Sequence, residues 1–405
     1  MKEKSLAAVI NREVARNRDR IISLAQDLIR IPSFSGDTEG LSGVAARIAP
    51  EMKGMGFSVE LPEAEKGLTN VVGRFRGSET APCILFNGHT DVVPVADEGD
   101  WHMPPFGAEI SDGRIYGRGA CDMKGGVTAM LAAPRVVFSL FPEFKGNIIL
   151  TATVDEEIGG FKGMKYVMEQ GIKADMGIVC EPTALKIVNV CKGLLWLKLN
   201  TRGKSAHGGT PENGINAVYK MSRILGRLEN YDFGQPPHPV LGKPTINVGS
   251  IKGGVKPNIV PDSCEAEIDI RYLPTQDHHK IIESLNAIIA ELIREDPQIE
   301  VELGIIRYRR SIETPKESTV IKTIEEGVRD ITGKYPGFTG MISPADSEYL
   351  VEAGIPAVVF GPGHGWLCHS ANEWIAIDDI LEATKMYAAI IIRSAGLADK
   401  LGSNH

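Results

Sequence analysis

The chain has 405 residues, of which 43% are hydrophobic and 24% are charged, a balance typical of a soluble globular protein. Its length predicts two domains, and its net charge of −8 argues against a nucleic-acid partner, which would require a basic face. No apolar run is long enough to span a membrane. We expect a cytoplasmic protein, because charges interrupt any N-terminal signal sequence and the six cysteines are spaced like free thiols.

Helices and strands alternate in the first half of the predicted structure. Apolar residues at helical spacing predict helices over 5–31, over 42–55 with a kink at Pro50, and from Met123 onward with a bend or break at Pro134. A further short helix is expected near 162–169. The predicted strands cover 57–61, 70–75, 83–93, 147–154 and 176–182. This alternation indicates an α/β fold with a mostly parallel central sheet.

The pattern changes near Lys192, where the order becomes strand, helix, strand, strand, helix, strand. That order is the ferredoxin-like split β-α-β plan, and it ends near Arg309. Helices over 319–330 and 379–395 and a strand over 356–363 then resume the α/β pattern. We therefore predict a discontinuous catalytic domain, residues 1–191 and 310–405, with a smaller α+β domain, residues 192–309, inserted into it.

Several predicted strands end in residues that can bind metal ions. The carboxyl ends of strands in an open α/β sheet are where functional groups gather. The residues concerned are His89 and Asp91, Glu156 and Glu157, and Glu181, with Asp122 at a helix entry and His369 after a later strand. A single divalent cation would need fewer ligands than these, so we expect two divalent cations that share Asp122 as a bridging ligand. Imidazole and carboxylate ligands favour zinc, with cobalt or manganese as substitutes.

Glu156 and Glu157 need different roles, because neighbours in an extended chain point to opposite faces. One is expected to bind metal, and the other to take a proton from metal-bound water. Asp91 lies two residues beyond His89 and can fix the tautomer of that imidazole.

A series of motifs resembles the co-catalytic zinc superfamily of acetylornithine deacetylase, succinyl-diaminopimelate desuccinylase, aminoacylase and glutamate carboxypeptidase. The motifs are GHTDVVP (88–94), GRGACDMKGG (117–126), DEEIGG (155–160), CEPT (180–183), GKSAHGGTPENGINAV (203–218), KPNIVPD (256–262), DIRYLP (269–274) and FGPG followed by CHSANEWI (360–375). They cover most of the chain in order.

The resemblance implies a role for each strand-end residue. One metal would be bound by His89, Asp122 and Glu181, and the other by Asp122, Glu157 and His369. Glu156 would be the general base, Asp91 would support His89, and a cis peptide bond would follow Asp122. His364 is an alternative to His369, but the spacing to the ANE motif favours His369.

The resemblance also gives the inserted domain a function as lid and dimerisation surface. His207 would reach the active site of the partner in a homodimer and stabilise the oxyanion, while Arg271 and Asn258 would hold the substrate. Near Asp346 the sequence SPADSEYL departs from the Thr-Ser-Asp turn of many deacetylases, so the loop that faces the substrate is expected to differ.

These observations predict a metal-dependent amidohydrolase that cleaves the amide of an N-acyl amino acid. A metal-bridging hydroxide, with Glu156 as general base, would attack the carbonyl. A dipeptidase or carboxypeptidase that acts on short peptides is the alternative within the same superfamily. A non-catalytic dimeric binding module is the alternative of another class, but it should have lost a ligand or the base, and none of these residues is replaced.

Overall fold

The computed structural model describes residues 5–398, and the chain divides into two compact units. The first comprises the chain up to Asn189, Thr314–Thr339 and the part from Ala345 onward, and the second comprises Val190–Glu313 with Gly340–Pro344. These boundaries lie a few residues from those expected, except that 340–344 belongs to the second unit. Among residues 5–398 no helix is both long and apolar enough to cross a membrane.

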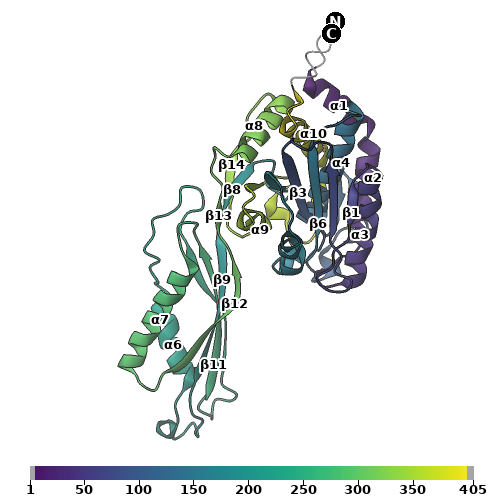
Figure 1. Cartoon of the computed structure of the whole chain (residues 1–405). Coiled ribbons are helices and arrows are strands. Elements are labelled where there is room, and N and C mark those ends of the chain that lie inside the picture. Colours follow the sequence, from purple (N-terminus) through teal and green to yellow (C-terminus); the bar gives the residue numbers. More distant parts are fainter. Residues whose placement is uncertain (1–4, 399–405) are drawn as a thin grey trace. The chain divides into compact units, whose positions relative to one another are not determined.

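Most strands of a nine-stranded sheet lie in the first unit and form its centre (Figure 1). Its order is β1-β2-β6-β3-β7-β15-β8-β13, with β14 also paired to β8. The strands are β1 (Ser58–Glu60), β2 (Val71–Arg76), β3 (Cys83–His89), β6 (Asn147–Thr153), β7 (Met176–Val179), β8 (Ile187–Cys191), β13 (Ile312–Glu313), β14 (Phe338–Met341) and β15 (Ala357–Val359). The four central strands, β6, β3, β7 and β15, are parallel, whereas β1, β2, β8 and β13 pair antiparallel. The sheet therefore has the parallel centre that the sequence predicts.

The register of the parallel strands brings their carboxyl ends level. His89 at the end of β3 lies opposite Thr153 at the end of β6, and Asn87 lies opposite Val179 at the end of β7. Val179 in turn pairs with Val359 at the end of β15. The residues that follow these four strands consequently leave the sheet at one edge.

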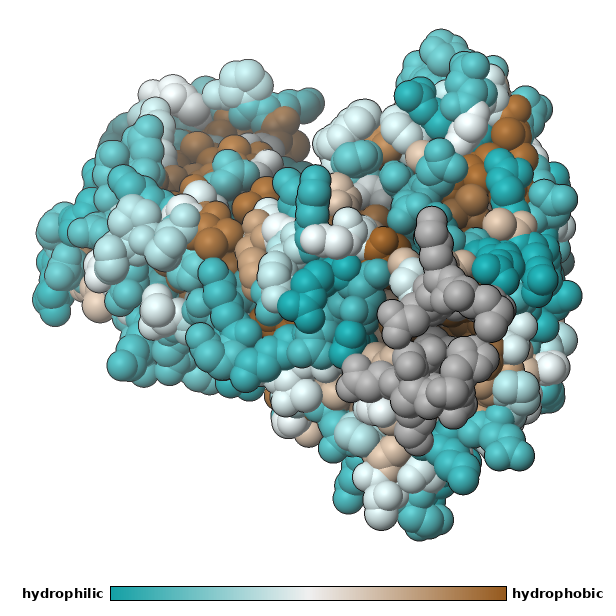
Figure 2. Space-filling model, turned by 90° about the horizontal axis from the view of Figure 1, so that it is seen from above, coloured by the Kyte–Doolittle hydropathy of each residue, from teal (hydrophilic) through white to brown (hydrophobic). Residues whose placement is uncertain are grey.

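Helices cover the sheet and enclose the main hydrophobic core. Apolar residues of α1–α4, α8 and α10 pack with those of β2, β3, β6 and β7 in one cluster. The helices of this unit are α1 (Leu6–Arg16), α2 (Arg18–Ile29), α3 (Thr38–Lys53), α4 (Gly125–Leu140), α5 (Tyr166–Glu169), α8 (Thr319–Thr332), α9 (Ser347–Glu352) and α10 (Ile377–Ser394). Hydrophilic residues cover most of the face in Figure 2. A small separate sheet contains β4 (Glu109–Ser111), β5 (Arg114–Tyr116) and β16 (Trp374–Ala376).

One sequence prediction about helices is corrected and another is narrowed. The segment 5–31 forms two helices that meet at Asn17, whose side-chain amide donates to the carbonyl of Glu13 at 2.9 Å. Of the bend or break expected at Pro134, the break is excluded, because Pro134 lies inside α4. Pro50 lies inside α3. Proline removes one backbone hydrogen bond, but α4 is buried along most of its length and its packing offsets that loss.

The second unit has the predicted β-α-β-β-α-β order. Its sheet order is β10-β11-β9-β12, with all pairs antiparallel, and α6 and α7 lie side by side on one face (Figure 1). Alternate residues of β9 and β11 pack with both helices in a second core. The elements are β9 (Gly193–Arg202), α6 (Ala217–Leu228), β10 (Thr245–Gly253), β11 (Ser263–Tyr272), α7 (His278–Glu295) and β12 (Glu300–Arg309).

Gly126 lets α4 lie close to the residue that follows β7. A Cβ atom at this position would lie 2.1 Å from the carbonyl oxygen of Cys180, at the end of β7. We expect Gly126→Ala to lower the free energy of unfolding by about 1–3 kcal/mol, because backbone must move to accept the methyl group. Gly226→Ala is the control: Gly226 is exposed in α6 with no atom near its missing Cβ, so alanine should raise stability by about 0.5–1 kcal/mol. Calorimetric unfolding of both variants measures these effects, and an unchanged Gly126→Ala transition would contradict the packing argument.

Candidate metal centre

The level carboxyl ends of β3, β6 and β7 bring three of the predicted metal-binding residues to one edge of the sheet. His89 is the last residue of β3, Glu157 lies in a short 3₁₀ helix (Glu156–Ile158) after β6, and Glu181 follows β7. The Nε2 atom of His89 lies 3.4 Å from a carboxylate oxygen of Glu181. His89 is only 1% exposed, so this half of the cluster is deeply buried.

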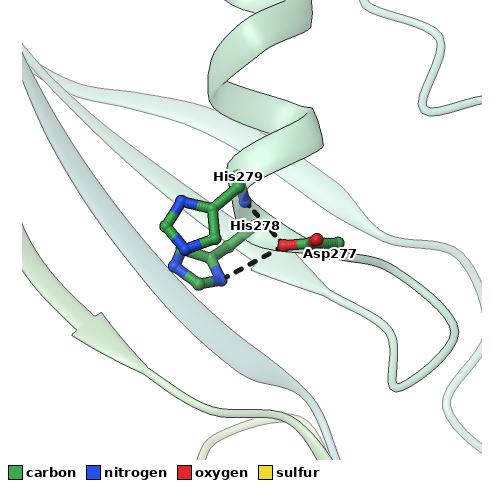
Figure 3. Close-up of side chains that lie close together, drawn as sticks. All are labelled: Asp277, His278 and His279. Atoms are coloured by element: carbon green, nitrogen blue, oxygen red, sulfur yellow. Dashed lines mark hydrogen bonds and ion pairs between the residues drawn. The ribbon is translucent and has the colours of Figure 1, made fainter.

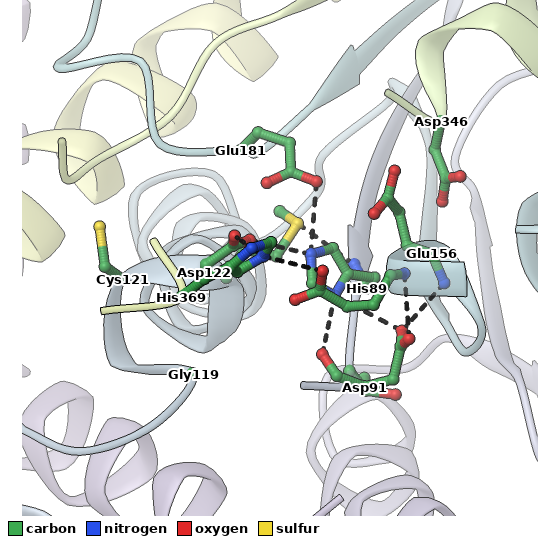
Figure 4. A network of polar contacts seen from close by, with 12 residues as sticks. His89, Asp91, Gly119, Cys121, Asp122, Glu156, Glu181, Asp346 and His369 are labelled. Carbon is green, nitrogen blue, oxygen red and sulfur yellow. Dashed lines mark hydrogen bonds and ion pairs between the residues drawn. The ribbon is translucent and has the colours of Figure 1, made fainter. Parts of the chain in front are cut away.

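Asp122 and His369 reach the same edge from outside the strands, and Asp122 lies close to both His89 and His369 (Figure 4). Its Oδ1 atom is 3.0 Å from Nε2 of His89, whereas its Oδ2 atom is 3.4 Å from Nε2 of His369. The same nitrogen of His369 lies 2.9 Å from Glu157 Oε2. The peptide bond after Asp122 is cis, as the resemblance implies.

Two groups of donor atoms result, and they share Asp122. His89, Asp122 and Glu181 form one, and Asp122, Glu157 and His369 form the other; in each, the donor atoms lie within 4.8 Å of one another. Because each oxygen of Asp122 faces a different histidine, this carboxylate has the arrangement that a bridging ligand requires. Among the described residues, His364 joins neither group.

Asp91 organises the centre without belonging to either donor group. Its backbone oxygen is 2.9 Å and its carboxylate 3.5 Å from Nδ1 of His89. Both are acceptors, so Nδ1 carries a proton, and Nε2, which faces Asp122 and Glu181, is the nitrogen that would give its lone pair to a bound metal ion. The carboxylate of Asp91 also accepts hydrogen bonds from the backbone N–H groups of Glu156 and Glu157 and from the hydroxyl of Ser35. The sequence predicts the contact with His89 but not those with the glutamates.

Asp155, which precedes Glu156 and Glu157 in the sequence, has a structural role. Asp155 adopts a left-handed conformation with φ of 72°, and its carboxylate accepts a hydrogen bond from the backbone N–H of Lys162 at 3.0 Å. It therefore closes the turn after β6.

The charges of the cluster favour bound cations. Burial, together with the charge of Asp122, raises the pKa of Glu157 to about 7, and burial raises the pKa of Glu181 well above its usual value. The charge of Glu156 adds to both effects. Hydrogen bonds to Asp122 and Glu157 raise the pKa of His369 to about 10. Without a metal, protons compensate the excess negative charge, and a divalent cation would take their place.

The residues present fit such cations. Two imidazoles and three carboxylates are ligands that zinc accepts, as do cobalt and manganese. One oxygen of Glu157 contacts His369, while the other, Oε1, is buried and has no hydrogen-bond partner among the described residues. A buried carboxylate oxygen without a partner is costly, and a nearby cation would satisfy it.

Three predicted site residues, His207, Asn258 and Arg271, lie in the second unit. His207 is exposed, and its loop pairs with that of Asn258, where the N–H of Gly208 donates to the carbonyl of Asn258 at 2.8 Å. Arg271 lies on β11, and its Nε atom donates to the carboxylate of Asp269 at 2.9 Å.

A third group of possible ligands, Asp277, His278 and His279, lies at the start of α7 (Figure 3). Asp277 caps the helix by accepting a hydrogen bond from the N–H of His279 at 2.9 Å. The ring of His278 packs between those of His279 and Tyr308, with centroid distances of 3.9 and 3.8 Å. These contacts explain the cluster as a helix cap with ring stacking, and the positive end of the helix disfavours a cation.

A network of buried polar side chains, which the sequence patterns did not predict, connects the central strands β3 and β6. Asn87 accepts hydrogen bonds from the hydroxyls of Thr151 and Thr153 at 2.8 and 3.2 Å and donates to the carboxylate of Asp346 at 3.2 Å. All four residues are buried. An asparagine inside the otherwise apolar strand CILFNGH was the signal that could have found it.

The fold and this centre define a class of metal-dependent hydrolases, and comparison with known proteins identifies the family. Residues 85–393 match the family "Peptidase family M20/M25/M40", so the chain belongs to that family, whose members hydrolyse amide or peptide bonds. The family's enzymes depend on a dinuclear metal centre.

Curated relatives match over most of their length. An N-formyl-4-amino-5-aminomethyl-2-methylpyrimidine deformylase from Bacillus subtilis (strain 168) is 27% identical over 95% of this chain and 96% of its own. An acetylornithine deacetylase from Myxococcus xanthus is 30% identical over 85% of this chain and 90% of its own. The crystal structure of a tripeptidase from Staphylococcus aureus superposes with a TM-score of 0.78 and 22% identity, covering 94% of this chain and 99% of its own. At that identity the structural likeness concerns the fold alone.

Glu156 and Glu157 allow a paired test of the metal centre. If the centre binds two ions, we expect Glu157→Gln to reduce them to one per chain, because it removes a negative donor from the group that contains His369. Glu156→Gln should retain both ions, since Glu156 belongs to neither donor group. Metal analysis after dialysis at low free zinc gives the stoichiometry. Equal metal content in the two variants would contradict the prediction that Glu157 binds metal and Glu156 does not.

Proposed function

We propose that the protein is a two-metal amidohydrolase that removes the acyl group from an N-acyl amino acid. The observation that carries this proposal is the pair of donor groups joined by the two oxygens of Asp122. Zinc is the metal that this ligand set favours, with cobalt or manganese as substitutes. Family membership supports the broader activity, the hydrolysis of linear amide or peptide bonds.

His89, Asp122, Glu157, Glu181 and His369 would hold two cations, which would supply Lewis-acid polarisation of the scissile carbonyl and a water of lowered pKa. Glu156 is the proposed general base that takes the proton of the attacking water and returns it to the leaving nitrogen. Its backbone is fixed by the hydrogen bond from its N–H to Asp91 Oδ1 at 3.1 Å. Because its charge raises the pKa of both Glu157 and Glu181, Glu156 lies within electrostatic reach of both donor groups.

Residues of the second unit are proposed to bind the substrate. His207 is exposed and therefore free to donate to the oxyanion, in the active site of a partner subunit if the inserted domain forms a homodimer. Arg271 can grip a carboxylate with its planar guanidinium, and Asn258 can hold a polar edge. In this chain Arg271 is paired with Asp269, so a substrate carboxylate would compete with that contact.

The relatives favour a short acyl group. The two curated relatives are named for removing a formyl and an acetyl group, and each match spans most of both chains. The structural neighbour is a tripeptidase, but its identity of 22% supports only the fold. We therefore place N-acyl amino acids before dipeptides and carboxypeptidase substrates, which the same chemistry could also cleave.

Replacing the proposed base separates catalysis from metal binding. Glu156→Gln should lower kcat by about 10²–10⁴-fold, the usual contribution of a general base, while metal content stays at the wild-type level. Steady-state hydrolysis together with metal analysis tests this. A variant that keeps full activity with both ions bound would contradict the role of Glu156.

A substrate panel tests the class of amide. We expect N-formyl-, N-acetyl- or N-succinyl-amino acids to be hydrolysed with higher kcat/KM than dipeptides or N-blocked dipeptides, in the presence of zinc, cobalt or manganese. Chromatographic detection of the released amine gives the rates, and an EDTA-treated sample is the control. A preference for dipeptides would assign the protein to the peptidase alternative, and no hydrolysis by the metal-loaded protein would favour a binding module.

A further inference from the structure

Glu373 is a buried carboxylate that binds the backbone of the loop carrying Asp122. It is 0% exposed. Its Oε1 atom accepts hydrogen bonds from the N–H groups of Cys121 and Asp122, at 2.8 and 3.0 Å. Its Oε2 atom accepts from the N–H of Gly119 at 3.1 Å and from Nη1 of Arg118 at 2.7 Å. Each oxygen of Glu373 therefore has two donors, in contrast to the carboxylate of Glu157.

Arg118 extends this arrangement to the loop that carries His369. Its Nη1 atom also donates to the carbonyl of Ser370 at 3.2 Å, and its Nη2 atom donates to the carbonyl of His369 itself at 3.3 Å. The Arg118 side chain is 4% exposed and lies over the ring of Trp101 at 5.2 Å. Its position is therefore fixed by packing as well as by hydrogen bonds.

The two side chains link segments that are far apart in the sequence. Residues 117–122 supply Asp122, residues 369–373 supply His369, and the backbone N–H of Gly117 also donates to the carbonyl of Glu373 at 2.9 Å. His369 has a φ of 63°, a left-handed conformation that is unfavourable for histidine and needs support from its surroundings. The hydrogen bond from Arg118 to its carbonyl gives that support.

We propose that Glu373 and Arg118 form a clasp that sets Asp122 against His369 and thereby determines the affinity for the second metal ion. The clasp, defined by these two residues, holds the backbone of Asp122 and His369, so its members are positioning residues. The inference rests on the proposed metal centre and adds two residues to it. It concerns the group of Asp122, Glu157 and His369 most, because Asp122 and His369 both depend on the clasp.

A carboxylate is required at position 373 because all four contacts are donors. Glutamine would offer one acceptor oxygen, and its amide N–H₂ would face either Arg118 and Gly119 or the N–H groups of Cys121 and Asp122. Two donors would then meet without an acceptor, which costs more than the loss of a hydrogen bond. The loop would shift and move Asp122 away from His369.

Glu51 provides a matched control in the same unit. Its carboxylate contacts three guanidinium groups, those of Arg20 at 2.8 Å, Arg47 at 3.0 Å and Arg135 at 3.2 Å. It lies on α3 and takes part in no donor group among the described residues. Glu51→Gln therefore removes a well-paired carboxylate without touching either ligand loop.

The experiment measures metal affinity on the full-length protein. Wild type, Glu373→Gln and Glu51→Gln are stripped with EDTA and titrated with zinc in competition with a chromophoric chelator, and their folding is checked by circular dichroism. We expect Glu373→Gln to weaken the second ion by about 10–100-fold, the usual effect of losing a residue that orients a ligand, and to leave the first ion less affected. Glu51→Gln should bind both ions like wild type.

Arg118→Lys provides a milder second variant in case Glu373→Gln does not fold. Lysine keeps the charge next to Glu373 but cannot hold the carbonyls of His369 and Ser370 with one planar group, so it should also weaken the second ion. In a double variant, the loss of affinity for the second ion caused by Arg118→Lys should not add to the loss caused by Glu373→Gln, since both residues act through one clasp. Wild-type affinity for both ions in folded Glu373→Gln or folded Arg118→Lys would overturn the inference. An equally large loss of zinc affinity in Glu51→Gln would overturn it as well.

The outcomes separate the clasp from the proposed function. Two tightly bound ions without hydrolysis of any amide would refute the function, and a weakened second ion in Glu373→Gln would still support the clasp. Hydrolysis with unaltered metal affinity in both clasp variants would refute the clasp alone. A folded wild-type protein that binds no zinc would refute both.

Discussion

Mutual repulsion of buried carboxylates at one edge of the sheet is the constraint around which the first unit is organised. The structure divides these carboxylates into two kinds. Asp91 and Glu373 receive hydrogen bonds from backbone N–H groups on both oxygens, so their charge is compensated by the protein itself. Glu157 instead keeps a buried oxygen without a partner in the described part of the chain. The first kind builds the scaffold, and the second leaves negative charge for a cation.

The parallel register converts this local chemistry into one site. Because β3, β6, β7 and β15 end level with one another, residues separated by about a hundred positions leave the sheet side by side. A buried hydrogen bond from Asn87 to Asp346 adds a polar link between β3 and the segment before α9. An antiparallel centre would send alternate strand ends to opposite edges and would separate His89 from Glu157.

The sequence predicted the parallel centre, the β-α-β-β-α-β order and the gathering of strand-end residues, because each has a local signal in hydrophobic periodicity or in a motif. It did not decide between a bend and a break at Pro134, since the packing that keeps this proline inside α4 comes from distant elements. It also missed Glu373 and Arg118. Their partners lie some 250 positions away, and neither spacing nor composition reveals which backbone N–H groups a buried carboxylate will meet. The proposed roles of the strand-end residues remain predictions for the experiments above.

The two halves of the centre differ in burial, and this difference has a functional consequence. The side chain of His89 is 1% exposed, whereas that of His369 is 54% exposed. An ion held with His89 would be shielded from water on most sides, while an ion held with His369 would stand at the surface, where substrate and solvent can reach it. The histidine on the surface side, His369, comes from a loop, whereas His89 ends a strand, and loops are less rigid than strands. A site that must admit substrate cannot gain rigidity by deeper burial. Buried hydrogen bonds behind the loops, such as those of Glu373 and Arg118, supply it from the side opposite to the solvent.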